Sequence, residues 1–222
     1  MNNDVGEIFR TDAKAEGEDV VIGGWESKGG AKPGESKWFA TRLTEQNCPW
    51  LHCRGEPFRV IAALELYSTL FGILAFMPEG GGCEGFGLVT GSAITDNRGN
   101  AYAVGNMMST KFPLNVLLME VSEQLEKRGS WLRVEWAPRE QNVHADALTN
   151  MELAEFDPQL RVDIDPSTVS WVLLTTMIEA GGNLSKELAE KKAKKKEERT
   201  AARRAKRQRK SREDALRVRD PW

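Results

Sequence analysis

The sequence is poor in the residues that build disulfide-bonded or zinc-stabilised domains. Its 222 residues include only three cysteines, Cys48, Cys53 and Cys83, and two histidines. An odd number of cysteines without a Cys-x-x-Cys pair argues against a disulfide framework and against a structural zinc site. We therefore expect reduced thiols, which are usual in a reducing compartment.

Long apolar runs and a leader sequence are also missing. The longest apolar stretch, residues 61–77, is interrupted by Glu65, Ser68 and Thr69, and a second stretch over 171–178 is too short to cross a bilayer. The first residues lack the basic and apolar regions of a signal peptide. We expect an intracellular protein of the cytoplasm or nucleus that has no membrane partner.

The two signs of charge are separated along the chain. The formal net charge is −2, but residues 183–222 hold 16 Lys and Arg against 7 Asp and Glu, which leaves residues 1–182 at a net −11. An acidic body followed by a basic tail indicates two regions with different tasks. We predict three segments: a domain over residues 1–160, a linker with a short amphipathic helix over 161–182, and a helical basic tail over 183–222. The short helix is expected over residues 167–180, between Pro166 and the pair Gly181–Gly182.

The hydrophobic pattern of the first 150 residues predicts the element order β-β-β-α-β-α-α-β-α. Three closely spaced strands indicate an antiparallel meander, and the later strands, which helices separate, indicate parallel pairing. The fold class is therefore α/β, with a mixed five-stranded sheet and helices on both faces. The predicted strands are 7–14, 20–25, 37–43, 88–95 and 131–136, and the predicted helices are 59–77, 99–108, 113–128 and 142–149.

Glu65 is the only charged residue within the apolar stretch 61–77. Burying an unpaired carboxylate costs several kcal/mol, so this residue needs a metal ion, a base or an opening of a cleft beside it. The alternative is a narrow solvent-facing stripe that Glu65 shares with Ser68 and Thr69.

Three further carboxylates occupy informative positions. Asp12 lies in or just after the first strand, Asp96 follows the fourth strand, and Asp146 lies in the first turn of the last helix. Each has an ordinary explanation, namely an edge position, a turn, or a favourable interaction with the helix dipole. Together with Glu65, however, they can converge on one end of the sheet. Crowded carboxylates repel one another unless divalent cations bridge them, and such hard oxygen ligands select Mg²⁺ or Mn²⁺.

These residues lie in motifs that resemble a known family. The motifs are Phe-Arg-Thr-Asp-Ala at 9–13, Ile-Ala-Ala-Leu-Glu-Leu at 61–66, Thr-Asp-Asn-x-x-Asn at 95–100 and Trp-x-Pro-Arg-Glu-x-Asn-x-x-Ala-Asp-x-Leu at 136–148. Over roughly residues 7–160 the chain resembles the ribonuclease H domain of retroelement (retrotransposon) reverse transcriptase polyproteins. The last motif is the most specific of the four.

The resemblance implies a ribonuclease H-like fold and hydrolysis of the RNA strand of an RNA–DNA hybrid with two Mg²⁺ ions, for which Mn²⁺ can substitute. In the implied mechanism Asp12 bridges both metals. Asp146 helps to hold the ion that activates the attacking water, and Glu65 and Asp96 help to hold the ion that stabilises the departing oxygen.

Five polar residues near these motifs are candidates for contacts to sugar hydroxyls and phosphates of the hybrid. Ordinary turn and cap chemistry is an equally good explanation for the first four, and a surface position on a helix is the better explanation for the histidine. The candidates are Asn97, Arg98, Arg139, Asn142 and His144.

Several alternatives stay open. The sequence has no Tyr/Phe-x-Asp-Asp motif, so a reverse transcriptase domain would be a partner on another chain or in a longer parent protein. The basic tail fits attraction to a nucleic-acid backbone, a nuclear import signal or a solvated helix. The domain itself fits an active hybrid nuclease, a catalytically inactive ribonuclease H-like module that binds nucleic acid, or an exonuclease or resolvase on the same fold.

Overall fold

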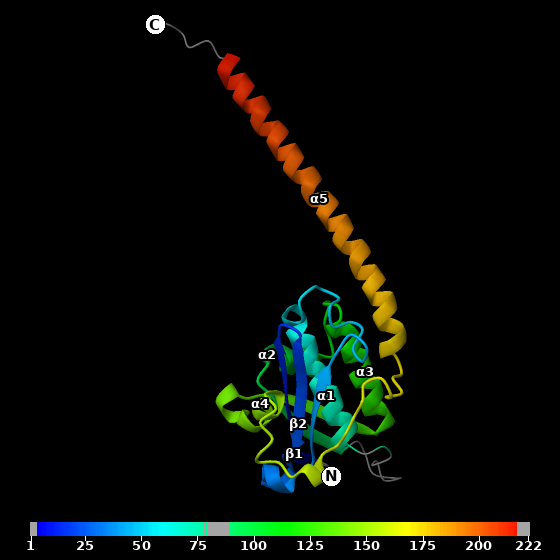
Figure 1. The fold of residues 1–222 in the computed structure, drawn as a ribbon. Helices are drawn as coiled ribbons and strands as arrows, with labels where there is room; N and C mark the ends of the chain where they lie inside the picture. Colours follow the sequence, from blue (N-terminus) through cyan, green and yellow to red (C-terminus); the bar gives the residue numbers. More distant parts are fainter. Residues whose placement is uncertain (1–3, 78, 80–88, 217–222) are drawn as a thin grey trace. The chain divides into compact units, whose positions relative to one another are not determined.

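A computed structural model describes residues 4–77, 79 and 89–216 (Figure 1). Residues 80–87 with Cys83, the predicted start of the fourth strand at residue 88 and the end of the tail at 217–222 lie outside the described residues.

A mixed sheet of five strands forms the centre of the fold. Its order is β3-β2-β1-β4-β5. β1 pairs antiparallel with β2, and β2 with β3, whereas β4 runs parallel to β1 and to β5. The fold class predicted from the sequence, α/β with a ribonuclease H-like sheet, is confirmed. The strands are β1 (Asp4–Glu16), β2 (Asp19–Glu26), β3 (Trp38–Leu43), β4 (Val89–Thr95) and β5 (Ser130–Trp136).

Helices cover both faces of the sheet (Figure 1). α1 (Ile61–Phe76) packs on β1 and β2 and is itself covered by α3 (Leu114–Lys127), while α4 (Val143–Thr149) packs on the other face against β1, β2 and β3. α2 (Arg98–Asn106) lies beside β4 and β5. The sandwiched position of α1 explains why its sequence is apolar nearly all round. Among the described residues the stretch Pro57–Phe76 is the one helix apolar and long enough to cross a membrane, and it is this core helix.

Close approach of backbones fixes where the helices sit on the sheet. Gly23 of β2 lies under α4, and a methyl group added there would be 2.8 Å from Cβ of Leu148. Only a residue without a side chain lets α4 pack this tightly, because protein interiors have no spare volume of that size. The position of α4, and of every side chain that it carries, therefore depends on a glycine in β2.

The linker predicted for residues 161–182 differs in the structure, because residues up to Gly181 form one compact unit with the preceding domain. The N–H of Val162 donates to the carbonyl of Trp38 at 2.7 Å, and the ring of Trp171 lies 5.7 Å from that of Tyr67. This segment is held by contacts with residues far away in the sequence. The hydrophobic pattern of residues 161–182 alone does not reveal such contacts.

The short helix predicted over 167–180 is also corrected. α5 begins at Leu174 and continues to Leu216, through the Gly181–Gly182 pair that was expected to end it. Its first turn is fixed by the buried carboxylate of Glu120 on α3, which accepts hydrogen bonds from the N–H groups of residues 172, 173 and 174 at 3.1, 2.7 and 2.9 Å. Gly181 serves close packing instead of helix termination, since an added methyl group would lie 2.7 Å from the ring of Phe112.

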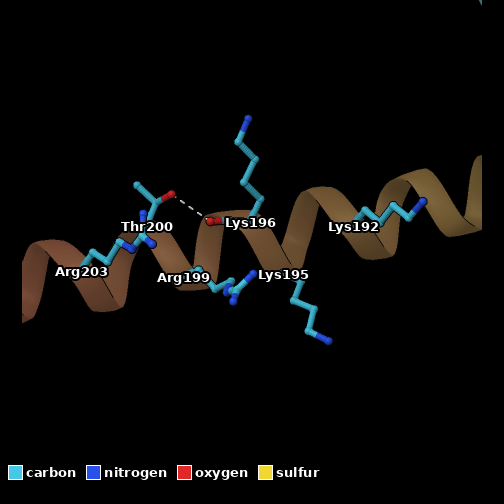
Figure 2. A pocket seen from close by; sticks show the side chains of 6 residues that line it. All are labelled: Lys192, Lys195, Lys196, Arg199, Thr200 and Arg203. Carbon is cyan, nitrogen blue, oxygen red and sulfur yellow. Dashed lines mark hydrogen bonds between the residues drawn. The ribbon is translucent and has the colours of Figure 1, made fainter.

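Residues from Gly182 onward form a second unit. As far as Leu216 this unit is a continuous helix rich in Lys, Arg, Glu and Ala, and its side chains from residue 186 to residue 208 are exposed to solvent. Figure 2 shows a part of this helix that is lined by basic side chains.

Candidate metal centre

Strand pairing brings Asp12 and Asp96 to the same edge of the sheet. Arg10 of β1 is the partner of Ile94 in the parallel strand β4, so continuing the register by two residues places Asp12 opposite Asp96. β4 ends at Thr95, whereas β1 continues to Glu16. Asp96 therefore follows the last residue of β4 and lies beside Asp12, at the point where the pairing of the two strands ends. The side chains thus gather at the carboxyl ends of the parallel strands, which is where open α/β sheets bind their ligands.

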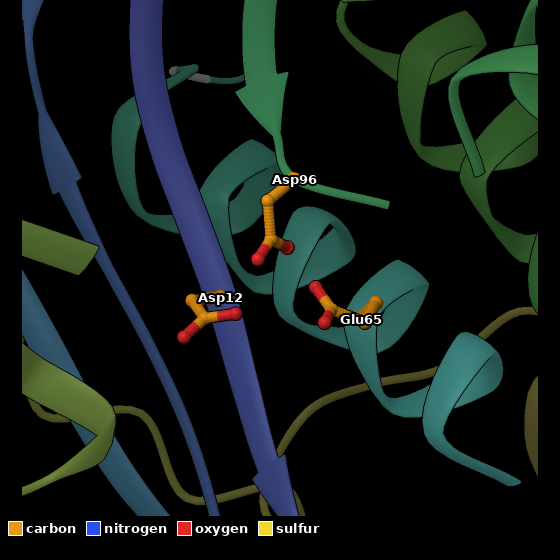
Figure 3. Close-up of side chains that lie close together, drawn as sticks. All are labelled: Asp12, Glu65 and Asp96. Carbon is orange, nitrogen blue, oxygen red and sulfur yellow. The ribbon is translucent and has the colours of Figure 1, made fainter. Parts of the chain in front are cut away.

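Glu65 reaches this edge from α1. Carboxylate oxygens of Asp12, Glu65 and Asp96 lie within 4.8 Å of one another (Figure 3). The solvent-stripe alternative for Glu65 is wrong, because the residue is only 6% exposed and its neighbours Ser68 and Thr69 are buried as well. Ser68 Oγ donates to the carbonyl of Gly23 at 2.9 Å, so that hydroxyl ties α1 to the sheet.

Asp146 borders the cluster on the side of α4. Arg139 donates a hydrogen bond to its Oδ1, and Asn150 Nδ2 donates to its Oδ2 at 3.1 Å. Thr149, three residues further along the same helix, donates to Oδ2 of Asp12 at 3.2 Å. The structure therefore brings three of the four predicted carboxylates into direct proximity and holds the fourth beside them in an ion pair with Arg139.

Burial and mutual repulsion raise the pKa values of the clustered carboxyl groups. Burial, followed by the charge of Asp96, raises the pKa of Asp12 from 3.8 to about 6. Burial and then the charges of Asp12 and Asp96 raise the pKa of Glu65 well above its ordinary value. Burial also raises the pKa of Asp96, while the nearby guanidinium of Arg139 opposes that rise. Each shift indicates too little positive charge around the carboxylates.

A divalent cation fits this deficit. Oε2 of Glu65 is buried and has no hydrogen-bond partner among the described residues. A buried oxygen without a partner is costly, and three carboxylates in contact are the ligand set that hard divalent cations prefer. Asp12, Glu65 and Asp96 can therefore hold a divalent metal ion.

Three of the five predicted nucleic-acid contacts, Asn97, Arg98 and Arg139, come from the segments that follow β4 and β5. The guanidinium of Arg98 stacks on the ring of Trp136 with 3.8 Å between its central carbon and the ring centre. Trp136 in turn donates from Nε1 to the carbonyl of Asp96 at 2.9 Å. Asn97 caps α2 by accepting the N–H of Asn100 at 3.2 Å. The charge of Arg139 therefore acts on Glu65 and Asp96, whereas the guanidinium of Arg98 lies over Trp136. Asn97 is a helix cap, as its alternative explanation predicted.

The other two predicted contacts are engaged elsewhere. Asn142 is buried and donates from Nδ2 to the carbonyl of Thr11 at 3.0 Å, which ties the loop before α4 to β1. His144 packs edge-on against Trp25, with 5.4 Å between ring centres, and its Nδ1 lies 3.2 Å from a carboxylate oxygen of Glu155. Among the described residues, the contacts of these two side chains are with Thr11, Trp25 and Glu155 and not with the four carboxylates.

Sequence reasoning missed two partners of the carboxylates. One is Thr149, and its signal is its position three residues after Asp146, on the same helix face. The other is the direct ion pair between Arg139 and Asp146, which lie seven positions apart and do not belong to one helix, so that no regular spacing indicates it.

Comparisons with known proteins return only solved structures. No protein-family model matches the sequence, and no curated protein matches it. The chain is similar to the RNase H1 of the halophilic archaeon Halobacterium salinarum NRC-1, with 18% identity and a TM-score of 0.44 over 68% of this chain and 97% of that one. It is also similar to LC11-RNase H1 in complex with an RNA/DNA hybrid, with 16% identity and a TM-score of 0.48 over 65% and 94%.

A third similar structure is the N-terminal RNase H domain of rv2228c from Mycobacterium tuberculosis, with 18% identity and a TM-score of 0.38 over 66% of this chain and 92% of that one. Since all three TM-scores are below 0.5, the class of the protein rests on its own sheet order and site. These define an α/β protein of ribonuclease H-like fold whose buried carboxylates can hold a divalent metal ion.

Proposed function

We propose that this protein is a metal-dependent endonuclease that hydrolyses the RNA strand of RNA–DNA hybrids and that it derives from a retroelement. The observation that carries the proposal is the meeting of Asp12, Glu65 and Asp96, which come from three separate elements, at the carboxyl edge of the sheet. The fold has no structural need for three mutually repelling carboxylates, two of them buried. The retroelement origin rests on the motif at residues 136–148 alone.

Each residue of the site has a distinct task in this proposal. Asp12, Glu65 and Asp96 would hold Mg²⁺, and Asp146, which now pairs with Arg139, would be the fourth carboxylate of a set for two ions. When bound, a pair of such ions lowers the pKa of an attacking water and stabilises the departing oxygen of a phosphodiester. Thr149 holds Asp12 in orientation through its 3.2 Å hydrogen bond. Arg139 and Arg98 supply positive charge for phosphates of the substrate.

Cleavage of defined substrates tests the proposal. Labelled RNA–DNA hybrid, duplex DNA and single-stranded RNA are incubated with the full chain in Mg²⁺ or in chelator, beside Asp96→Asn. Loss of RNA from the hybrid alone, dependent on metal and absent in the variant, is the expected result. Asp163→Asn is the matched control, because Asp163 is an exposed carboxylate whose partner is Arg161. Cleavage of duplex DNA would favour an exonuclease or resolvase instead.

One observation favours a second candidate, a ribonuclease H-like module that binds nucleic acid without cutting it. Arg139 already neutralises Asp146, so in the folded chain the fourth carboxylate is bonded to a cation of the protein itself. If that ion pair persists in saturating Mg²⁺, the two-ion chemistry lacks one ligand. Hybrid that is bound but left intact, by both the parent chain and Asp96→Asn, would establish this alternative and end the first proposal.

A further inference from the structure

Seven of the nine basic residues between residues 192 and 207 of α5 lie on one side of the helix. Successive residues of an α-helix are rotated by about 100°, so positions three and four apart share a face. Seven cations between residues 192 and 207 follow that spacing and occupy about a third of the circumference, a surface we call the basic stripe. All seven are exposed. The stripe consists of Lys192, Lys195, Lys196, Arg199, Arg203, Lys206 and Arg207.

Figure 2 looks onto this face. Lys195 and Lys196 point to its opposite edges, and Lys192, Arg199 and Arg203 lie between them on successive turns. The one uncharged side chain in the view is Thr200, whose hydroxyl donates to the carbonyl of Lys196 at 2.9 Å and is therefore satisfied within the helix. The face offers cationic groups and little else.

The acidic residues of the same region lie on the opposite side. Glu187 and Glu190 each precede a lysine by four residues, Lys191 and Lys194, a spacing that favours ion pairing along a helix. Glu197 and Glu198 follow Lys194 on that side. These four glutamates share their side of the helix with Lys191 and Lys194, and none of them lies on the basic stripe.

The separation leaves the basic stripe without internal compensation. Within the part of the chain that the structure describes, no carboxylate lies within ion-pair distance of any of its seven cations. Its members are neighbours of like charge at spacings of three and four, which disfavours an isolated helix. An external polyanion removes that repulsion.

We propose that the basic stripe binds the phosphodiester backbone of double-stranded nucleic acid without regard to sequence. From Lys192 to Arg207 it extends about 22 Å, which is long enough to meet several phosphates. α5 contains no aromatic residue, so stacking on unpaired bases is not available to it. Between residues 192 and 207 the only apolar residues are alanines, so it also lacks the large apolar face by which helices enter a lipid surface.

The basic stripe carries the charge that attracts a polyanion, whereas residues 1–182 carry the opposite net charge. Residues 1–182 carry a net −11 and repel a polyanion at long range, and the stripe supplies the opposite charge on a separate unit. The proposal is independent of whether the carboxylate cluster cuts its substrate, because backbone attraction needs no metal.

The salt dependence of the affinity for duplex DNA follows from the number of cations that contact phosphates. If all seven cations contact phosphates, a plot of log affinity against log salt concentration has a slope of about −6 for duplex DNA. Affinity then falls at least about 1,000-fold between 50 and 200 mM salt. Contact through three or four cations would halve the slope.

Fluorescence anisotropy of labelled 20-base-pair duplexes tests the proposal with the full chain in chelator, which keeps the result separate from any metal-dependent cutting. One variant, K192Q/K195Q/R199Q/R203Q, removes four charges from the stripe. The matched control, K186Q/K191Q/K194Q/R204Q, removes four charges from the other sides of α5. Circular dichroism verifies that both variants keep their helix.

The stripe variant should lose at least tenfold in affinity at 100 mM salt, with the slope reduced by about 4, for RNA–DNA hybrid and duplex DNA alike. The control should change by less than about threefold. Equal losses in the two variants would overturn the proposal, because total charge would then decide binding and not the face. Parent chain that binds phosphatidylserine vesicles but no duplex would overturn it in favour of a lipid surface.

Discussion

Replacing Asp12 with Asn should make the metal-free protein more stable at neutral pH, although it removes a ligand of the proposed metal site. Burial and the charge of Asp96 raise the pKa of Asp12 to about 6 in the folded protein, against 3.8 as the ordinary value. Between these two pH values the unfolded chain has released its proton and the folded chain has not. The free energy of unfolding is therefore unaffected below about pH 4 and falls as the pH rises from 4 to 6.

The size of the effect follows from the shift. A difference of about 2 pKa units corresponds to about 3 kcal/mol, all of it lost above pH 6. Asn has the size of Asp and keeps an oxygen that can accept the hydrogen bond of Thr149. The variant should therefore be up to about 3 kcal/mol more stable than the parent at pH 7.5 in chelator, and equal to it near pH 4.

Urea denaturation followed by tryptophan fluorescence measures this difference at pH 4 and pH 7.5, in chelator and in Mg²⁺. Mg²⁺ should stabilise the parent and leave Asp12→Asn unchanged, since a ligand that binds only the folded state adds its binding energy to stability. Asp163→Asn, the exposed carboxylate, should behave like the parent throughout. A variant less stable than the parent at pH 7.5 in chelator would refute the reasoning, because the buried charge would then be compensated by the protein itself.

Three further predictions concern the surroundings of the site. Glu120→Gln should cost about 3 kcal/mol at pH 7 by urea denaturation, because three backbone N–H groups lose a charged acceptor. Burial raises the pKa of Glu120, but hydrogen bonds from Gln124 and the backbone outweigh burial and lower the pKa below 4.5. The stability that Glu120 contributes is therefore present above pH 4.5 and is lost as the pH falls through the lowered pKa. The variant should lack this acid dependence of the free energy of unfolding. Gly23→Ala should lower the free energy of unfolding by about 1–3 kcal/mol, seen as a lower melting temperature, and should reduce hybrid cleavage, because its methyl group displaces Leu148 and with it α4. Gly105→Ala, which has open space around it, should change neither. Arg139→Gln should bind Mg²⁺ about tenfold more tightly by calorimetry, since it removes a cation from Asp146; unchanged affinity would show that metal does not use that carboxylate.

The strands and the core helix could be predicted because their signals are local. A run of apolar residues bounded by turn residues identifies β4, and an apolar stretch closed by a proline identifies α1. Glu65 could be singled out for the same reason, since one charge in such a helix needs a partner wherever the chain folds. Once the strand order is known, the four carboxylates, which are distant in the sequence, can be expected at one end of the sheet.

The errors lie where distant contacts decide the structure. The start of α5 is set by Glu120 on α3, and no feature of the residues around 174 reveals it. Gly181, one of the two glycines that suggested a helix end, is explained by the close approach of Phe112. At the site, the hydrogen bonds from Arg139 to Asp146 and from Thr149 to Asp12 depend on how α4 packs on the sheet. The spacing of these residues in the sequence does not predict that packing.

The carboxylate of Glu120 also has a consequence for the far end of the chain. Starting a helix is unfavourable, since the first turn must be ordered before it gains its own hydrogen bonds. By binding the free N–H groups of residues 172–174, Glu120 provides a preformed first turn from which the remaining residues of α5 can grow. A tail of crowded like charges is a poor helix former on its own, so its order is inherited from the folded body. Residues 183–222 as a free peptide should accordingly lose much of their helical content.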